Sequence, residues 1–168
     1  SAMSHDTLGD HFDIHCGGVD NIFPHHENEI AQSKCITGKG FVNYWLHSEF
    51  LIVGGGKMSK SLGNYYKISD LIKLGLTPES VRYQLLSGHY RTKISFSLDK
   101  KFEADKILER INGFHNTLKG LGANNSSSNS YPDAYELFKR YMNDDLDTPR
   151  SLAVFFDWMK YTNKKIKL

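Results

Sequence analysis

The sequence has few cysteines, no long apolar run and almost no net charge, and each absence excludes a class of protein. Two cysteines, Cys16 and Cys35, cannot form a disulfide framework, so we expect a reducing, cytoplasmic environment. No apolar segment approaches the length that spans a membrane, and residues 1–18 do not look like a signal peptide. The net charge of +2 gives no support for nucleic-acid binding by overall charge.

The amino-terminal third combines strand and helix signals. Residues 12–14 predict a short strand that runs into residues 16–18, where two glycines allow a tight turn. Pro24 suits the first turn of a helix that we expect to reach about Cys35. The apolar residues 50–53, followed by three glycines, suit a buried strand of a parallel sheet. Two strands cannot form such a sheet, so we expect the remainder to precede the first residue.

Helical patterns dominate the rest of the chain. Ser69 is placed to cap a short helix at residues 70–74 that Gly75 ends, and Thr77-Pro78 opens another through about Leu86. Beyond these, apolar residues at spacings of four, three and four define one face of a long helix ended by two glycines: Ile107, Ile111, Phe114 and Leu118, then Gly120 and Gly122.

A polar Asn/Ser tract at residues 123–130 is typical of a surface loop, and two further helices are expected after it. Thr148-Pro149 opens the second of them. Their apolar residues are Leu137, Phe138, Tyr141 and Met142 in the first, and Leu152, Phe155, Phe156 and Met159 in the second. The predicted fold class is therefore an α/β portion followed by an all-helical bundle.

The run of residues 23–29 places metal-ligand side chains at the start of a helix. Residues four apart share a helical face, so His25 and Glu29 project together, whereas Glu27 points away from His25. An imidazole and a carboxylate on one face form half of a tetrahedral zinc site. The alternative is a solvated polar helix start, in which the helix dipole favours the carboxylates. The spacing alone leaves both interpretations open.

A second candidate site is the loop that follows the three glycines, Lys57-Met58-Ser59-Lys60-Ser61. Two lysines and two hydroxyls beside glycines suit a loop that closes over polyphosphate, where the ammonium groups meet the charge of a leaving pyrophosphate. On its own, the loop is more typical of an ordinary solvated Lys/Ser segment. The common phosphate loop with a G-x-x-x-x-G-K-[ST] pattern is absent from the sequence.

Taken together, these motifs resemble the cysteinyl-tRNA synthetases. The HHENE run at residues 25–29 is highly specific to that family, and the KMSKS run at residues 57–61 is shared by many synthetases of its class. The resemblance extends over nearly the whole chain and rests on residues 1–4, 12–15, 17, 18, 20, 23–32, 57–64, 83–91 and 144–149.

The resemblance implies a fold and a division into domains. The first 64 residues would be the carboxyl-terminal part of a Rossmann-type catalytic domain, including the lysine loop. Residues 65–97 would form a connecting region, and residues 98–168 a helical bundle that starts the tRNA-binding region. The family's HIGH motif and two zinc-binding cysteines would lie before Ser1, so we expect this chain alone to form no cysteinyl-adenylate and to hold zinc weakly.

The same resemblance implies site residues. His25 and Glu29 correspond to two zinc ligands. His15, Gly18 and Asp20 correspond to an adenosine pocket, and Lys57 and Lys60 to the lysines that stabilise the activation transition state. The family usually has glycine in place of Cys16, so we expect that the local turn differs here.

The implied reaction is ATP-dependent activation of L-cysteine to cysteinyl-adenylate and transfer of the cysteine to tRNA(Cys). Zn²⁺ would select the substrate thiolate, and Mg²⁺ would accompany ATP. The expected protein is cytoplasmic, monomeric and without a membrane partner.

Two rival functions remain open at this point. One is the related ligase that joins cysteine to an amino sugar in mycothiol synthesis, and the other is a non-catalytic tRNA-binding module derived from a synthetase. A polar, purely structural helical protein is a weaker third. A basic tail at Lys160, Lys164, Lys165 and Lys167 fits a solvated helix end better than a phosphate contact.

Overall fold

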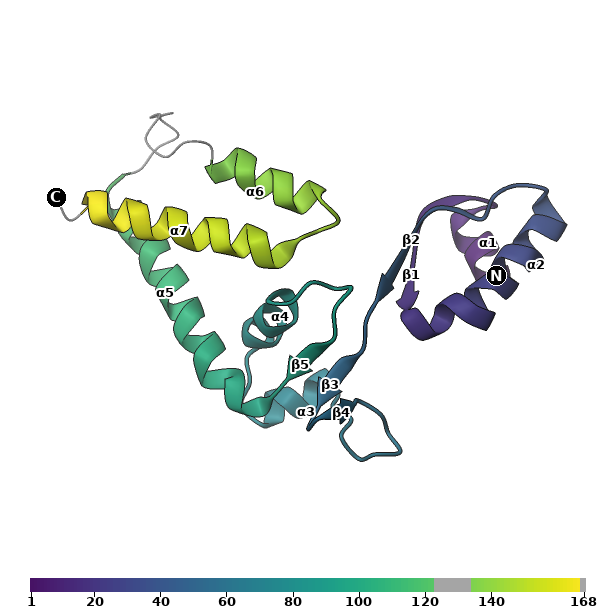
Figure 1. The fold of residues 1–168 in the computed structure, drawn as a ribbon, viewed down its shortest axis with the longest axis horizontal. Helices are drawn as coiled ribbons and strands as arrows, with labels where there is room; N and C mark the ends of the chain where they lie inside the picture. Colours follow the sequence, from purple (N-terminus) through teal and green to yellow (C-terminus); the bar gives the residue numbers. More distant parts are fainter. Residues whose placement is uncertain (123–133, 167–168) are drawn as a thin grey trace. The chain divides into compact units, whose positions relative to one another are not determined.

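A computed structural model of the chain describes residues 1–122 and 134–166, which divide into two compact units (Figure 1). The first unit contains residues 1–51 and 90–94, and the second contains the remaining described residues. The predicted polar loop at residues 123–130 and Lys167 lie outside the described residues. The division into domains at residues 64 and 97 stays a prediction.

The first unit is built on two parallel strands, β1 (Phe12–Gly18) and β2 (Val42–Ser48). They pair in register from Phe12 opposite Val42 to Gly18 opposite Ser48, and α2 (Glu27–Thr37) connects them. Parallel strands need such a crossover connection, because a tight turn reverses the chain direction and so joins only antiparallel strands. Helix α1 (Ala2–Leu8) lies beside α2 in Figure 1, with His5 Nε2 3.2 Å from Ser33 Oγ.

The link from β1 to α2 consists of two short helical turns, Val19–Asn21 and Ile22–His26. The predicted helix is confirmed, but its regular α-helical part begins at Glu27 and not at Pro24. Phe23, directly before the proline, has extended backbone angles (φ −133°, ψ 133°), as the proline ring requires of its predecessor. The chain therefore enters the helix through a kink that places His25 and His26 in the turn before Glu27.

Two predictions for this part of the chain are wrong. Residues 16–18 do not turn: they continue β1, and neither Gly17 nor Gly18 has positive φ. The strand predicted at residues 50–53 exists as β3 (Leu51–Val53), but it pairs antiparallel with β4 (Gly56–Lys57). The reason is the turn, since two consecutive glycines at φ 60° and 82° close a two-residue hairpin.

The second unit adds a small sheet of strand order β4-β3-β5, with β5 at Ile94–Phe96, and the predicted helices. Helix α3 spans Ile68–Lys73 and ends before Gly75, at φ 83°. Ser69 lies inside α3 and does not cap it. Instead the Asp70 carboxylate accepts a hydrogen bond from the Lys67 backbone N–H, at 3.0 Å, because residue 67 is the one with extended backbone angles.

The remaining helices confirm the sequence patterns. Thr77 caps α4 (Pro78–Leu86), and its hydroxyl accepts from the Ser80 N–H at 3.1 Å. A short turn at Leu98–Lys100 leads into α5 (Lys101–Gly120). Helices α6 (Ala134–Asn143) and α7 (Thr148–Ile166) pack side by side (Figure 1). Phe114 of α5 is buried and meets Trp158 of α7 edge to face, with ring centroids 5.2 Å apart.

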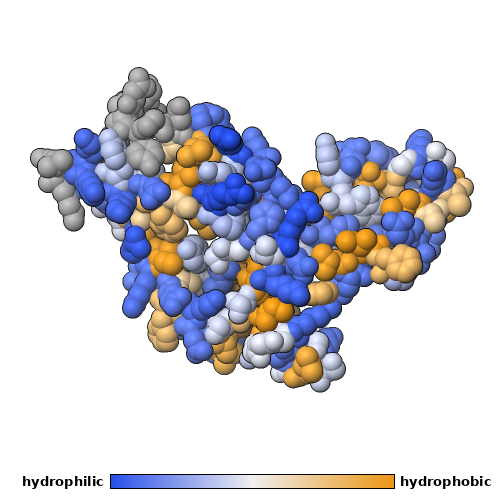
Figure 2. Space-filling model, in the orientation of Figure 1, coloured by the Kyte–Doolittle hydropathy of each residue, from blue (hydrophilic) through white to orange (hydrophobic). Residues whose placement is uncertain are grey.

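Both units carry exposed hydrophobic residues. Figure 2 shows hydrophobic patches among hydrophilic residues on the visible face of each unit. Ile14 and Tyr44 are register partners on the β1–β2 strand pair and remain 58% and 70% exposed. Among the described residues, no helix combines the length and apolarity that crossing a bilayer requires.

Candidate functional site

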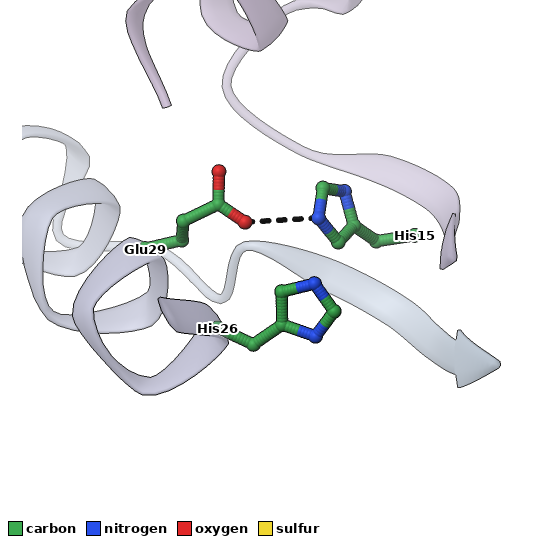
Figure 3. Close-up of side chains that lie close together, drawn as sticks. All are labelled: His15, His26 and Glu29. Carbon is green, nitrogen blue, oxygen red and sulfur yellow. Dashed lines mark ion pairs between the residues drawn. The ribbon is translucent and has the colours of Figure 1, made fainter. Parts of the chain in front are cut away.

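The first unit brings together three metal-ligand side chains, His15, His26 and Glu29. His15 comes from β1, His26 from the turn before α2, and Glu29 from the first turn of α2. Their potential ligand atoms all lie within 4.8 Å of one another, and the three side chains converge in Figure 3. His15 faces this cluster from the strand, and the ring of its register partner Trp45 meets the His15 ring edge to face, with centroids 5.0 Å apart.

Glu29 is the centre of this cluster and is almost fully buried, at 8% exposed. One carboxylate oxygen, Oε1, is 3.3 Å from the Ser1 amine. The other, Oε2, is 2.9 Å from His15 Nε2. Burial alone would raise the pKa of Glu29, but the hydrogen bond from the Ser1 amine and the charge of His15 hold the pKa below its ordinary value. The carboxylate is therefore ionised at neutral pH.

His26 is the most deeply buried member of the cluster, at 3% exposed. Its Nδ1 lies 2.8 Å from Nε2 of His47 on β2, and the Trp45 ring lies 4.8 Å away between centroids. Burial, followed by the neighbouring imidazoles of His15 and His47, lowers the pKa of His26. The ring is therefore neutral at pH 7, which is the form that binds metal ions.

The predicted metal pair, His25 and Glu29, lies on one face of the helix start, as the spacing requires. His25 Nε2 is 3.9 Å from Glu29 Oε2, but the His25 side chain is 63% exposed. Glu29 Oε2 is buried and has no aligned hydrogen-bond partner among the described residues, although two imidazoles approach it. A buried carboxylate oxygen without a donor fits a cation site, so Glu29 and its imidazole neighbours fit the zinc that the family implies.

His26 and His47 are the site residues that the sequence reasoning missed. Residues 42–48 alternate Val42, Tyr44 and Leu46 with Asn43, Trp45 and His47. This period of two is the signal of a strand, and it could have placed His47 on the same face as Trp45.

The two glycines of β1 make room for side chains of the site. A Cβ on Gly17 would lie 2.6 Å from His26 Cε1, and a Cβ on Gly18 would lie 2.5 Å from Asp20 Oδ1. Gly18 and Asp20, two of the three predicted adenosine-pocket residues, therefore lie next to each other. The third, His15, has its ring beside the Glu29 carboxylate instead. Cys16 is exposed in a regular strand position opposite Leu46, so its side chain needs no unusual turn.

The predicted lysine loop lies in the second unit. Lys57 ends β4, and both Lys57 and Lys60 are exposed. The Asn64 side chain ties the loop together: its Oδ1 accepts from the Ser59 N–H at 2.9 Å, and its Nδ2 donates to the Val53 and Lys57 carbonyls at 2.9 and 3.2 Å. Lys60 Nζ is 5.5 Å from the centre of the Tyr65 ring.

Two further motif segments meet within the second unit. His89 Nε2 lies 2.9 Å from the Asp145 carbonyl oxygen, and the Thr148 hydroxyl donates to the Gly88 carbonyl at 3.4 Å. Separately, a groove of about 570 Å³ runs between α5 and α7, and its lining includes Arg110 and two residues of the predicted basic tail, Lys160 and Lys164.

Comparison with known proteins shows which family the chain is similar to. The family described as tRNA synthetases class I (C) catalytic domain matches residues 1–106. The cysteine--tRNA ligase of Brachyspira hyodysenteriae is 44% identical over 171 residues, covering 97% of this chain and 36% of that protein. The cysteine--tRNA ligase of Legionella pneumophila (strain Paris) is 46% identical over 164 residues, covering 98% and 35%. This chain thus spans about a third of the length of the curated relatives it matches.

A solved structure shares the fold at low sequence identity. The ternary complex of Agrobacterium radiobacter K84 agnB2 LeuRS with tRNA and LeuAMS matches 91% of this chain and 22% of its own chain, with a TM-score of 0.69 and 18% identity. The α/β arrangement followed by helices is therefore that of a class I synthetase. Because the family match covers more than half of the chain and runs through the HHENE and KMSKS motifs, the chain belongs to the class I (C) tRNA synthetases, the family of the cysteine--tRNA ligases.

Proposed function

We propose that this chain supplies part of the active site of an enzyme that activates L-cysteine with ATP and transfers it to tRNA(Cys). The observation that carries the proposal is the His25–Glu29 pair on one face of a helix start, within a sequence that matches cysteine--tRNA ligases along its length. His25 and Glu29 would hold Zn²⁺, which when bound coordinates a thiolate and so distinguishes cysteine from serine or alanine.

The chain's own residues would act on ATP in two places. His15, Gly18 and Asp20 would bind the adenosine part of the nucleotide, with the Asp20 carboxylate accepting hydrogen bonds from ribose hydroxyls. Lys57 and Lys60 would stabilise negative charge on the pyrophosphate, with Mg²⁺ accompanying the nucleotide. Both lysines are exposed, so their ammonium groups can reach an anionic ligand.

The chemistry proposed is a two-step transfer. The carboxylate of cysteine attacks the α-phosphate of ATP, forming cysteinyl-adenylate and releasing pyrophosphate. A hydroxyl of the terminal ribose of tRNA(Cys) then attacks the activated carbonyl and releases AMP. We further propose that the enzyme is a cytoplasmic monomer. We also propose that the 168-residue chain alone forms no adenylate, because the curated relatives are about three times as long.

The test is cysteine-dependent ATP–pyrophosphate exchange with a chimera in which this chain replaces the matching third of the Brachyspira hyodysenteriae ligase. The chimera should exchange pyrophosphate and charge tRNA(Cys), and His25→Ala should reduce its zinc content and its preference for cysteine over serine. The isolated chain should be inactive. A chimera that folds but shows no exchange, or a His25→Ala variant with unchanged zinc and selectivity, would contradict the proposal.

A further inference from the structure

We propose that His89 is a positioning residue, which holds the turn between α6 and α7 against the end of α4 and so fixes the direction of α7 relative to α4 and α5. Two motif segments that the proposed reaction does not use, residues 83–91 and 144–149, meet at this contact. The consequence for catalysis rests on the proposed function, whereas the contact itself can be tested without any activity.

The contact consists of two hydrogen bonds between segments that are 56 and 60 residues apart in the sequence. His89 Nε2 donates to the Asp145 carbonyl at 2.9 Å, and the direction is unambiguous because a carbonyl oxygen only accepts. The Thr148 hydroxyl donates to the Gly88 carbonyl at 3.4 Å. The His89 side chain is 20% exposed, so its ring is largely enclosed by neighbouring groups.

The turn that receives His89 has a backbone conformation that requires support from outside the turn. Asp145 and Leu146 both have a φ of 56°, in the left-handed region that residues other than glycine disfavour. Such conformations persist where the surrounding structure holds them, and they gather at functional positions. The next residue, Asp147, is buried, and its Oδ1 accepts from the Arg150 N–H at 3.0 Å, as a helix cap does. A movement of the turn therefore moves the start of α7.

Three contacts connect α4, α5 and α7 in a triangle. The buried Ser80 hydroxyl of α4 donates to the Asp105 carboxylate near the start of α5. Phe114 of α5 meets Trp158 of α7, and Figure 1 shows the two helices diverging from this contact, with α4 at their open side. His89 closes the third side of the triangle. Without it, the aromatic pair becomes a pivot about which α7 can turn.

For the proposed reaction, the direction of α7 matters in the second step. The lysine loop at residues 57–61 leads into α3 and α4, whereas residues 98–168 would begin the tRNA-binding region. Pyrophosphate exchange needs no tRNA, so it does not depend on α7. If only a fraction of molecules holds α7 in the required direction, the apparent KM for tRNA rises by the inverse of that fraction. Loss of one hydrogen bond changes such a population about two- to tenfold.

The first experiment measures the direction of α7 in the 168-residue chain. After both exposed native cysteines are replaced by serine, spin labels on Arg82→Cys and Ala153→Cys, exposed positions of α4 and α7, report a distance distribution by pulsed electron paramagnetic resonance. His89→Ala should widen this distribution, and His89→Gln, whose amide can donate from the position of Nε2, should restore it. His115→Ala, an exposed histidine of α5, is the matched control and should leave it unchanged. An unchanged distribution in His89→Ala overturns the inference.

Far-UV circular dichroism checks that each variant folds. If His89→Ala does not fold, Thr148→Val takes its place, because it keeps the side-chain shape and removes only the second hydrogen bond. Thr148→Val should widen the distribution to a smaller extent, and an unchanged distribution would again overturn the inference.

The second experiment uses the active chimera. His89→Ala should raise the KM for tRNA(Cys) about two- to tenfold and leave cysteine-dependent pyrophosphate exchange unchanged, and His89→Gln should recover the KM. An unchanged KM, or equal losses in exchange and charging, overturns the positioning role in the reaction. A chimera without any exchange contradicts the proposed function, whereas the distance distribution still decides whether His89 fixes α7.

Discussion

The histidine–glutamate cluster of the first unit and the lysine loop of the second unit are constructed in opposite ways. Glu29 and His26 are 8% and 3% exposed and are held by two parallel strands and a helix start. Lys57 ends β4 and Lys60 lies in the loop that follows; both are exposed, and the Asn64 side chain ties this loop together. One region buries its charge, and the other presents it to solvent.

The difference in burial fits the roles proposed for the two regions, a metal site and a loop that meets pyrophosphate. A fixed metal ion benefits from ligands that are already oriented and poorly hydrated, because electrostatic attraction is strong where water is excluded. A leaving pyrophosphate carries growing negative charge, so lysines that meet it must stay charged and accessible until the nucleotide arrives. Substitutions should therefore affect stability and metal binding in the first region, and catalytic rate in the second.

The largest effect expected concerns the loop. In the chimera, Lys60→Ala should lower the rate constant for pyrophosphate exchange about a hundredfold, since one well-placed donor to developing charge contributes about that much. Lys73→Ala, an exposed lysine of α3, is the matched control and should leave the rate unchanged. Equal rates for both variants would remove the loop from the proposed chemistry, and equal stabilities by urea unfolding would confirm that the effect is catalytic.

The next effect concerns the space that Gly17 leaves for the His26 ring. Gly17→Ala should reduce the free energy of unfolding by about 1–3 kcal/mol, because its new methyl group would overlap a buried imidazole. Gly40→Ala is the control, since its Cβ would meet nothing within 4 Å. Urea unfolding followed by circular dichroism measures both. Similar values for the two variants would mean that the ring moves aside freely and that the buried cluster is less rigid than its packing indicates.

A smaller effect is expected from removing the asparagine that ties the loop. Asn64→Ala loses three hydrogen bonds and should cost about 1–3 kcal/mol of local stability. Trypsin should then cut after Lys57 or Lys60 about tenfold faster or more, because cleavage follows the population of opened loop. Asn116→Ala, on the exposed face of α5, should leave the cleavage rate unchanged. An unchanged rate for Asn64→Ala would show that the loop is held by other contacts.

The smallest expected effect is the pH dependence of the cluster without metal. The folded-state pKa of His26 lies below its unfolded value of about 6.5, so the unfolded chain binds the proton more readily. The contribution of His26 to stability is therefore complete above about pH 6.5 and declines as the pH falls through that value towards the folded pKa. His26→Gln should flatten this slope in urea unfolding measured with a chelator. A slope as steep as that of the unmodified chain would assign the dependence to other groups.

The success of the helix predictions and the failure of some strand predictions have different physical causes. Helices α4, α5, α6 and α7 appear where apolar spacing and proline positions predict them, because a helix satisfies its hydrogen bonds locally. The short elements α1, β2 and β5 were not predicted. Helix α1 and strand β5 are short, whereas the period of two in residues 42–48 does indicate β2. A strand also acquires its hydrogen bonds only from a partner distant in sequence. The parallel pairing predicted for residues 50–53 is wrong for the same reason. A short apolar run does not reveal which strand pairs with it or in which direction.

By itself, the sequence determined the order of the helices, the shared face of His25 and Glu29, and the family motifs, all of which depend on spacing within one segment. The tertiary structure decided which imidazoles reach the Glu29 carboxylate. His15 and His47 enter the site from two strands that pair across 30 residues, and His26 enters through a kinked turn that helical spacing does not describe. Local periodicity predicts the faces of one element, whereas contacts between elements depend on register and on backbone kinks.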